Sequence, residues 1–123
     1  MSVLVIDDSR AVRTIIRSIL REMNLDVVEA GNGQEGIDRL RDSANIDLVL
    51  VDWNMPVMDG LEFIIAVRAD KVYDPVRIVM VTTETESSQI SRALAAGANE
   101  YVMKPFTKDV LVAKLSLLDV FGE

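Results

Sequence analysis

Residues 50–56 read Leu-Val-Asp-Trp-Asn-Met-Pro, and they lead from an apolar run into a loop that begins with an acidic side chain. The run before Asp52 predicts a strand that is covered on both faces, and Pro56 marks a place where a central strand cannot continue. Two other apolar runs of the chain end in a similar way. The first is followed by Asp7-Asp8, and the last by Lys104-Pro105. Carboxylates and one ammonium group therefore follow the ends of three predicted strands.

Short apolar runs recur along the chain at intervals that leave room for a helix between them. They are rich in β-branched residues and mostly do not alternate with polar ones, which is typical of strands in a parallel sheet. The predicted strands cover residues 3–6, 27–28, 48–51, 78–81 and 101–103.

Segments with helical spacing fill the gaps between these runs. Residues 33–42 predict a weaker second helix, a third follows Gly60, and a fourth ends before Gly97, a residue suited to the position after a helix. Ser9 and Thr107 are placed to cap the first and the last helix. The apolar side chains that carry the predicted helices are Val12, Ile15, Ile16, Ile19, Leu20, Met23, Ile37, Leu40, Leu61, Ile64, Ile65, Ile90, Ala93, Leu94, Val110, Leu111, Leu115 and Leu118.

This pattern predicts an α/β fold, a (βα)5 doubly wound open parallel sheet of the flavodoxin-like kind with strand order 2-1-3-4-5. The length of 123 residues fits one domain that covers residues 1–123. In such a sheet the first and third strands are neighbours, and ligands bind beyond their carboxyl ends. The topology is therefore expected to bring Asp7, Asp8 and Asp52 together.

Composition excludes several classes of function. The formal charge of −7 opposes nucleic-acid binding, and the arginines between residues 10 and 21 are expected on a solvated helix face. The chain has no cysteine, which excludes thiol chemistry. It also has no histidine, so any phosphohistidine that donates a phosphoryl group to it must belong to another protein. With no apolar stretch of membrane-spanning length, we expect a cytoplasmic protein without membrane contact. We also expect the protein to be a monomer.

Three carboxylates at one place repel one another unless a cation shares the site, and oxygen ligands without nitrogen or sulfur favour Mg²⁺, with Mn²⁺ as a substitute. Asp8 and Asp52 are candidates for direct ligation, Asp7 for ligation through water, and the backbone carbonyl of Asn54 completes the predicted set. Asp52 is the candidate nucleophile because it follows the central strand. An aspartate nucleophile can accept a phosphoryl group to give an acyl phosphate. Two further side chains are placed to reach the oxygens of such a group, the ammonium of Lys104 and the hydroxyl of Thr82.

The order and spacing of these motifs resemble the receiver domains of two-component response regulators over the whole chain, most closely the stand-alone chemotaxis type without an effector domain. The motifs that carry the resemblance are Val-Ile-Asp-Asp-Ser-Arg (5–10), Val-Asp-Trp-Asn-Met-Pro-Val-Met-Asp-Gly (51–60), Val-Thr-Thr-Glu (81–84), Ala-Gly-Ala (96–98) and Tyr-Val-Met-Lys-Pro-Phe (101–106).

The resemblance implies that Asp52 accepts a phosphoryl group from a sensor histidine kinase with Mg²⁺ bound, and that Lys104 pairs with the acidic cluster and then with the phosphoryl group. It also implies a cis bond before Pro105. Thr82 would move onto a phosphoryl oxygen and leave room for Tyr101 to turn inward. That change would remodel the face formed by the fourth helix, fifth strand and fifth helix. This face would bind an output partner of the flagellar-motor type, and a phosphatase is a further expected partner.

In this family two neighbours set the lifetime of the acyl phosphate, here Asn54 and Glu84, and both match the rapidly self-hydrolysing type. Thr83 stands where the family often has Ala or Gly, and its bulk is expected to narrow the access of water to the phosphoryl group. The loop 84–88 lacks the lysines found there in enteric relatives, which indicates either altered partner contacts or a solvated, variable loop.

Two other functions compete with a switch. A phosphorelay carrier would pass the phosphoryl group to a histidine phosphotransfer protein, although Asn54 and Glu84 favour fast turnover. A Mg²⁺-dependent phosphatase would need a second acid just after Asp52, where the chain has Trp53, Asn54 and Met55. The chain is therefore expected to take phosphoryl groups from small donors and to lose them by itself, without turning over an external substrate as an enzyme does. A flavin site is disfavoured because Asp7-Asp8 would repel its phosphate.

Overall fold

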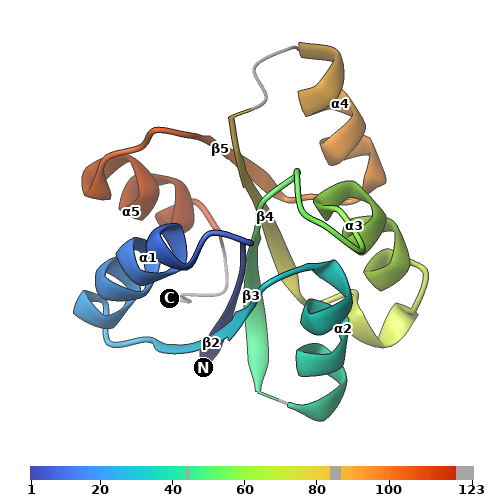
Figure 1. The fold of residues 1–123 in the computed structure, drawn as a ribbon, viewed down its shortest axis with the longest axis horizontal. Helices are drawn as coiled ribbons and strands as arrows, with labels where there is room; N and C mark the ends of the chain where they lie inside the picture. Colours follow the sequence, from blue (N-terminus) through green and yellow to red (C-terminus); the bar gives the residue numbers. More distant parts are fainter. Residues whose placement is uncertain (44, 84–86, 119–123) are drawn as a thin grey trace.

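A computed structural model describes residues 1–43, 45–83 and 87–118 of the chain. Within them, parallel strands and helices alternate from one end to the other (Figure 1). The elements are β1 (Ser2–Ile6), α1 (Arg10–Glu22), β2 (Asp26–Ala30), α2 (Gly33–Asp42), β3 (Ile46–Val51), α3 (Gly60–Arg68), the short 3-10 helix η1 (Lys71–Tyr73), β4 (Arg77–Thr82), α4 (Ser87–Ala96), β5 (Glu100–Met103) and α5 (Lys108–Ser116).

The strands form one sheet in the order β2-β1-β3-β4-β5, which confirms the predicted doubly wound, flavodoxin-like fold. Figure 1 shows α1 and α5 on one face of the sheet and α2, α3 and α4 on the other. Successive side chains of a strand point to opposite faces. Val3 and Val5 accordingly pack in the layer with α1 and α5, whereas Leu4 and Ile6 pack in the layer with α2, α3 and α4. Both faces of the sheet are therefore covered, as its apolar strands require.

Local sequence explains where the helices begin and end. The side chain of Ser9 accepts a hydrogen bond from the Val12 amide at 3.3 Å, and Thr107 caps α5 through the Val110 amide at 3.2 Å, so both predicted caps are confirmed. Asp59 and Glu62 form a reciprocal capping box at the start of α3, which the sequence reading did not anticipate. Gly97 follows α4 with φ +123°, as expected of a residue that ends a helix.

The predicted apolar faces were wrong at one side chain in each of four helices. These side chains keep between 44% and 55% of their surface exposed: Ile15, Ile65, Leu94 and Val110. In every case an adjacent residue in the chain is buried at 1% exposure or less: Ile16, Ile64, Ala93 and Leu111. Since neighbouring residues of a helix are turned by about 100° from each other, the exposed member of each of these four pairs lies beyond the edge of the face that meets the sheet.

The strands extend beyond the apolar runs that predicted them, most of all at β2. The run 27–28 predicted two residues, whereas β2 covers Asp26–Ala30. This strand lies at the edge of the sheet, and its polar Glu29 forms ion pairs with Arg13 and Arg17 of α1. An edge strand can carry such a side chain, so apolar content alone underestimates its length.

Arg68, at the end of α3, joins three segments at the edge of the sheet opposite the carboxyl ends of the strands. Its guanidinium donates to the carbonyl oxygens of Gly97 (3.0 Å), Tyr73 (2.9 Å) and Val76 (2.7 Å), and to the side chain of Asn99 (2.9 Å). One planar cation thus satisfies acceptors of the loops before β4 and β5.

In the part of the chain that the structure describes, no helix has the length and apolar character needed to cross a lipid bilayer.

Candidate functional site

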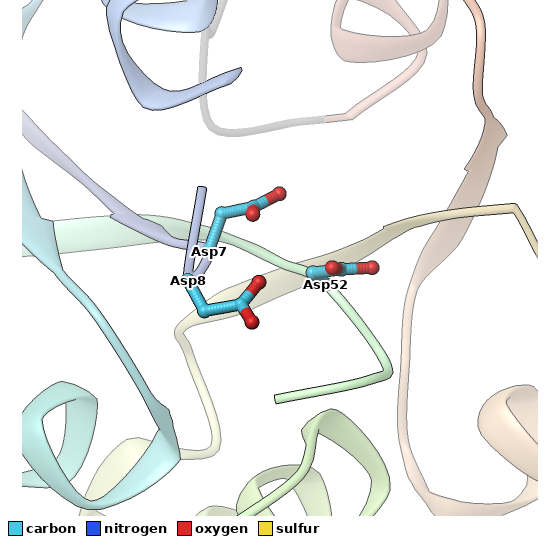
Figure 2. A group of neighbouring side chains, drawn as sticks. All are labelled: Asp7, Asp8 and Asp52. Atoms are coloured by element: carbon cyan, nitrogen blue, oxygen red, sulfur yellow. The ribbon is translucent and has the colours of Figure 1, made fainter. Parts of the chain in front are cut away.

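Three carboxylates meet beyond the carboxyl ends of β1 and β3, which are neighbouring strands. Asp7 and Asp8 follow β1, and Asp52 follows β3. Figure 2 shows the three side chains turned toward a common space. One carboxylate oxygen from each of them lies within 4.8 Å of the others. The structure therefore brings together the carboxylates that the strand order was expected to unite.

Each of the two buried carboxylates is fixed by backbone donors. Asp7, which is 2% exposed, accepts a hydrogen bond at Oδ1 from the Ser9 amide at 2.8 Å. Asp52, which is 9% exposed, accepts one at Oδ1 from the Trp53 amide at 2.8 Å. Asp8 is exposed. The site therefore combines two fixed carboxylates with one that faces solvent.

Lys104 reaches this cluster from the end of β5. Its Nζ lies 2.8 Å from Asp7 Oδ2 and 3.4 Å from Asp52 Oδ2. The Lys104 amide donates to the carbonyl of Thr82 at 2.8 Å, which joins the ends of β4 and β5. The bond between Lys104 and Pro105 is cis, so that prediction is confirmed. One ammonium group thus lies between two carboxylates that would otherwise repel each other.

The donor set fits a hard divalent cation. All three clustered side chains offer carboxylate oxygens, and the chain contains neither histidine nor cysteine. Such oxygen-only sets suit Mg²⁺. Asn54 follows Asp52 by two residues in the chain and is exposed. Its backbone carbonyl remains the predicted fourth ligand.

The remaining candidate residues lie at different depths around the cluster. Thr82 ends β4 and is fully buried, and Tyr101 in β5 is 8% exposed within the core layer that contains α3 and α4. Thr83 is exposed and lines a cavity of about 350 Å³ together with Lys104. Glu84, predicted to tune the lifetime of the acyl phosphate, lies outside the described residues, as does most of the loop 84–88.

Two arginines near the site were not predicted. Arg13, expected on a solvated face, donates from its Nη1 to the backbone carbonyl of Asp7 at 2.5 Å and from its Nε to Glu29 at 2.9 Å. Its spacing of six residues from Asp7 was the available signal, because that distance places the first turns of α1 over the end of β1. Arg92 of α4 lies 5.9 Å from the ring centroid of Trp53, within cation–π range. Helical spacing could not indicate this contact between distant segments.

Burial raises the pKa of Asp52 above its ordinary value. Removal of the carboxylate from water is the main cause, the Lys104 ammonium opposes the shift, and the negative charge of Asp7 adds to it. A raised pKa means that the ionised form of Asp52 costs folding free energy. The site thus keeps a reactive carboxylate at the expense of stability.

This cost predicts a pH dependence of stability. In acid, Asp52 is protonated in both the folded and the unfolded state, and the penalty is absent. As the pH rises, the unfolded carboxyl ionises first, so the folded state binds more protons and the free energy of unfolding falls until the raised pKa is passed. We therefore expect Asp52→Asn to be more stable than the wild type near neutral pH, in urea denaturation without divalent metal, and the difference to vanish in acid. A difference that does not change with pH would contradict this explanation.

Comparison with known proteins places this geometry in context. The family model described as a response regulator receiver domain matches residues 3–116. The chain is 45% identical to a protein named chemotaxis protein CheY homolog from Campylobacter jejuni subsp. jejuni, and the match covers 99% of this chain and 93% of that protein. It is 41% identical to chemotaxis protein CheY1 of Helicobacter pylori, with 96% of each chain covered.

A solved structure agrees with these sequence matches. Chemotaxis protein CheY4 of Vibrio cholerae superposes with a TM-score of 0.88 at 34% identity, over 94% of this chain and 96% of that one. The likeness thus extends over nearly the full length of each protein compared.

Proposed function

Since the chain belongs to the response regulator receiver domain family, we propose that it is a response regulator domain whose Asp52 accepts a phosphoryl group from a histidine kinase. The observation that carries this proposal is the position of Lys104 Nζ, 3.4 Å from Asp52 Oδ2 and 2.8 Å from Asp7 Oδ2. A cation at this place can neutralise a phosphoryl group on Asp52 as soon as the group arrives. The chain contains no histidine, so the donor imidazole belongs to another protein.

The chemistry needs few parts. A carboxylate oxygen of Asp52 forms a bond to phosphorus while the phosphorus–nitrogen bond of the donor phosphohistidine breaks, and the released imidazole takes up a proton. Asp8, Asp52 and the Asn54 carbonyl would hold Mg²⁺, with Asp7 acting through water, and the ion would supply positive charge to the phosphoryl oxygens. Hydrolysis of the acyl phosphate by water returns Asp52 to its carboxylate form. No external substrate is turned over.

Phosphorylation would act on the output face through two buried side chains. Thr82 ends β4 next to Lys104, and Tyr101 lies one strand further out, in β5. A hydrogen bond from the Thr82 hydroxyl to the phosphoryl group would favour one packing of Tyr101 over another. The face formed by α4, β5 and α5 would change with it. The names of the relatives favour a chemotaxis role, in which this face binds a component of the flagellar motor switch.

The proposal can be tested with beryllofluoride, which mimics a phosphoryl group, in the presence of Mg²⁺. The chain has a single tryptophan, Trp53, which is 7% exposed and donates its amide to Asp52. Its fluorescence should therefore change when Mg²⁺ binds and again when beryllofluoride binds. The beryllofluoride response should disappear with EDTA. A wild-type protein that responds to neither addition would refute the proposal.

Thr83 provides a prediction about the lifetime of the signal. Its exposed side chain lines the cavity beside Lys104. Removal of its hydroxyl and methyl groups in Thr83→Ala should widen the path of water, and we expect the acyl phosphate to decay about two to five times faster, a change of about 1 kcal/mol or less in the barrier. Decay would be followed after removal of excess acetyl phosphate. Thr14→Ala, at an exposed threonine of α1, is the matched control.

The wild-type half-life in the same assay separates the switch from the carrier. Decay within seconds fits a switch, whereas decay over hours fits a protein that passes its phosphoryl group to a histidine phosphotransfer partner. An unchanged rate in Thr83→Ala would show that this side chain does not control access of water.

A further inference from the structure

Arg13 of α1 joins the backbone of the acidic site to the edge strand of the sheet. Its Nη1 donates to the carbonyl oxygen of Asp7 at 2.5 Å, and its Nε donates to the Glu29 carboxylate at 2.9 Å. The Arg13 side chain is only 18% exposed, so neighbouring groups cover most of it. A planar guanidinium can hold two acceptors in fixed directions at once. Arg13 therefore fixes the end of β1 relative to β2.

The Asp7 carbonyl belongs to the peptide group that joins two of the clustered carboxylate residues, Asp7 and Asp8. The Asp7 amide still bonds within the sheet, to the Ala30 carbonyl at 3.1 Å, whereas α1 begins at Arg10. The chain leaves the sheet between these points. Because the peptide group is planar, a donor on its carbonyl limits the rotation of the whole plane. The two carboxylate side chains depart from the two ends of that plane.

The other partner of the guanidinium is itself held in place. One carboxylate oxygen of Glu29 accepts from Arg13 Nε, and the other lies 3.4 Å from Arg17 Nη1. The backbone carbonyl of Glu29 accepts from Arg39 Nε of α2 at 3.2 Å. Side chains of two helices thus contact Glu29, and Glu29 in turn orients Arg13. Charge-assisted hydrogen bonds connected in this way reinforce one another.

The charge of Arg13 does not favour a cation in the acidic site. A guanidinium near the site repels a divalent cation, and its contact is with a neutral carbonyl rather than with a carboxylate. Its contribution to metal binding is therefore geometric, because it can place the carboxylates but does not act through attraction to the ion.

We propose that Arg13 is a positioning residue of the metal site, which holds the peptide between Asp7 and Asp8 so that both carboxylates face the divalent cation. This inference rests on the proposed function, because it assumes that Mg²⁺ binds among the three clustered carboxylates. Groups that orient metal ligands without touching the metal contribute to the affinity of a site. Arg13 would do so through the backbone.

The test is Arg13→Met, which keeps part of the stem and offers no donor. The dissociation constant for Mg²⁺, measured from Trp53 fluorescence and from the Mg²⁺-induced rise in melting temperature, should increase at least about threefold. The melting temperature in EDTA should fall by about 5 °C, because the Asp7 carbonyl and Glu29 lose a donor. Charge alone predicts the opposite change in affinity, since the substitution removes a positive charge. A purely structural role would lower the melting temperature and leave the dissociation constant unchanged.

Arg17→Met is the matched control. Arg17 lies in the same helix and pairs with the same carboxylate, but its guanidinium bonds Glu29 rather than the backbone of the acidic site. This variant should not raise the dissociation constant for Mg²⁺. An equal rise in Arg17→Met and Arg13→Met would show that the lost ion pair with Glu29 is the cause, and it would overturn the role of the contact with Asp7.

Glu29→Ala tests the second partner and leaves Arg13 itself in place. Its dissociation constant for Mg²⁺ should lie between those of the wild type and Arg13→Met, and this expectation stands even if Arg13→Met does not fold. The double variant should bind no more weakly than Arg13→Met, because both substitutions break the same chain of contacts. Additive losses would contradict the proposal. An ionic strength of about 0.5 M would limit the direct effect of the lost Glu29 charge.

The outcomes separate this inference from the proposed function. If the wild type does not bind Mg²⁺, the proposed function fails. If the wild type binds Mg²⁺ and Arg13→Met binds it with the same or a lower dissociation constant, the role of Arg13 is overturned while the proposed function stands.

Discussion

Asp52→Asn is expected to abolish the incorporation of a phosphoryl group from acetyl phosphate, with a loss of at least about a hundredfold in rate. An amide oxygen is a far weaker nucleophile than a carboxylate, and the substitution also removes one of the clustered negative charges that would hold the cation. The fold should survive, because the asparagine oxygen can still accept the hydrogen bond from the Trp53 amide. Intact mass after rapid quenching in acid would count the phosphoryl groups on the chain.

Asp47→Asn is the matched control for this experiment. Asp47 lies in the same strand, β3, but it is exposed and is not part of the acidic cluster. This variant should incorporate one phosphoryl group at the wild-type rate. Undiminished incorporation in Asp52→Asn would show that another side chain is the acceptor, and it would remove the central residue of the proposed function.

Arg68→Met is expected to give the largest loss of stability among the substitutions considered, about 3 kcal/mol, or about 10 °C in melting temperature. The thioether fills part of the space of the Arg68 stem but offers no donor. The carbonyl oxygens of Gly97, Tyr73 and Val76 then lose the guanidinium, and acceptors left without a donor away from water cost more than the bond itself contributes. Urea denaturation would measure the change.

Two controls show whether geometry or charge causes the loss. Arg68→Lys keeps the positive charge but cannot reach several acceptors at once, so it should recover only a small part of the stability. Arg21→Met removes an exposed arginine from the last turn of α1 and should change the free energy of unfolding by less than about 0.5 kcal/mol. Equal stabilities of Arg68→Met and the wild type would mean that water replaces the guanidinium without cost.

Asp52→Asn and Arg68→Met test different regions of the molecule. Asp52 lies at the carboxyl ends of the strands, where chemistry is placed, and Arg68 at the opposite edge, where loops are joined. A variant that fails at one edge should therefore keep the properties of the other.

The sequence predicted the fold because its signals were local and consistent. Apolar runs identified the strands, and helical spacing with caps at Ser9 and Thr107 identified most of the helices. The strand order then followed from the alternation of strands and helices, and it brought Asp7, Asp8 and Asp52 together without knowledge of any side-chain contact. The cis bond before Pro105 was predicted by resemblance alone, since no spacing rule implies it.

Features that depend on contacts between distant segments could not be predicted in this way. Helical spacing assigned Ile15 to the core, although Ile16 occupies the face that meets the sheet. Arg13 was expected in solvent, whereas it contacts the end of β1. Val57 has a left-handed backbone conformation, with φ +70°, although a β-branched residue disfavours that conformation, so its residue type gave no signal for it. In each case the outcome is decided by neighbours that are close in space and remote in the chain.

The cation that balances the acidic site belongs to the last strand of the chain. All three clustered carboxylates lie within the first 52 residues, and Lys104 follows β5. A nascent chain on the ribosome, or a fragment that stops short of residue 104, therefore carries the three negative charges without the ammonium group that offsets them. The order of synthesis leaves the charge balance of this site to be completed last.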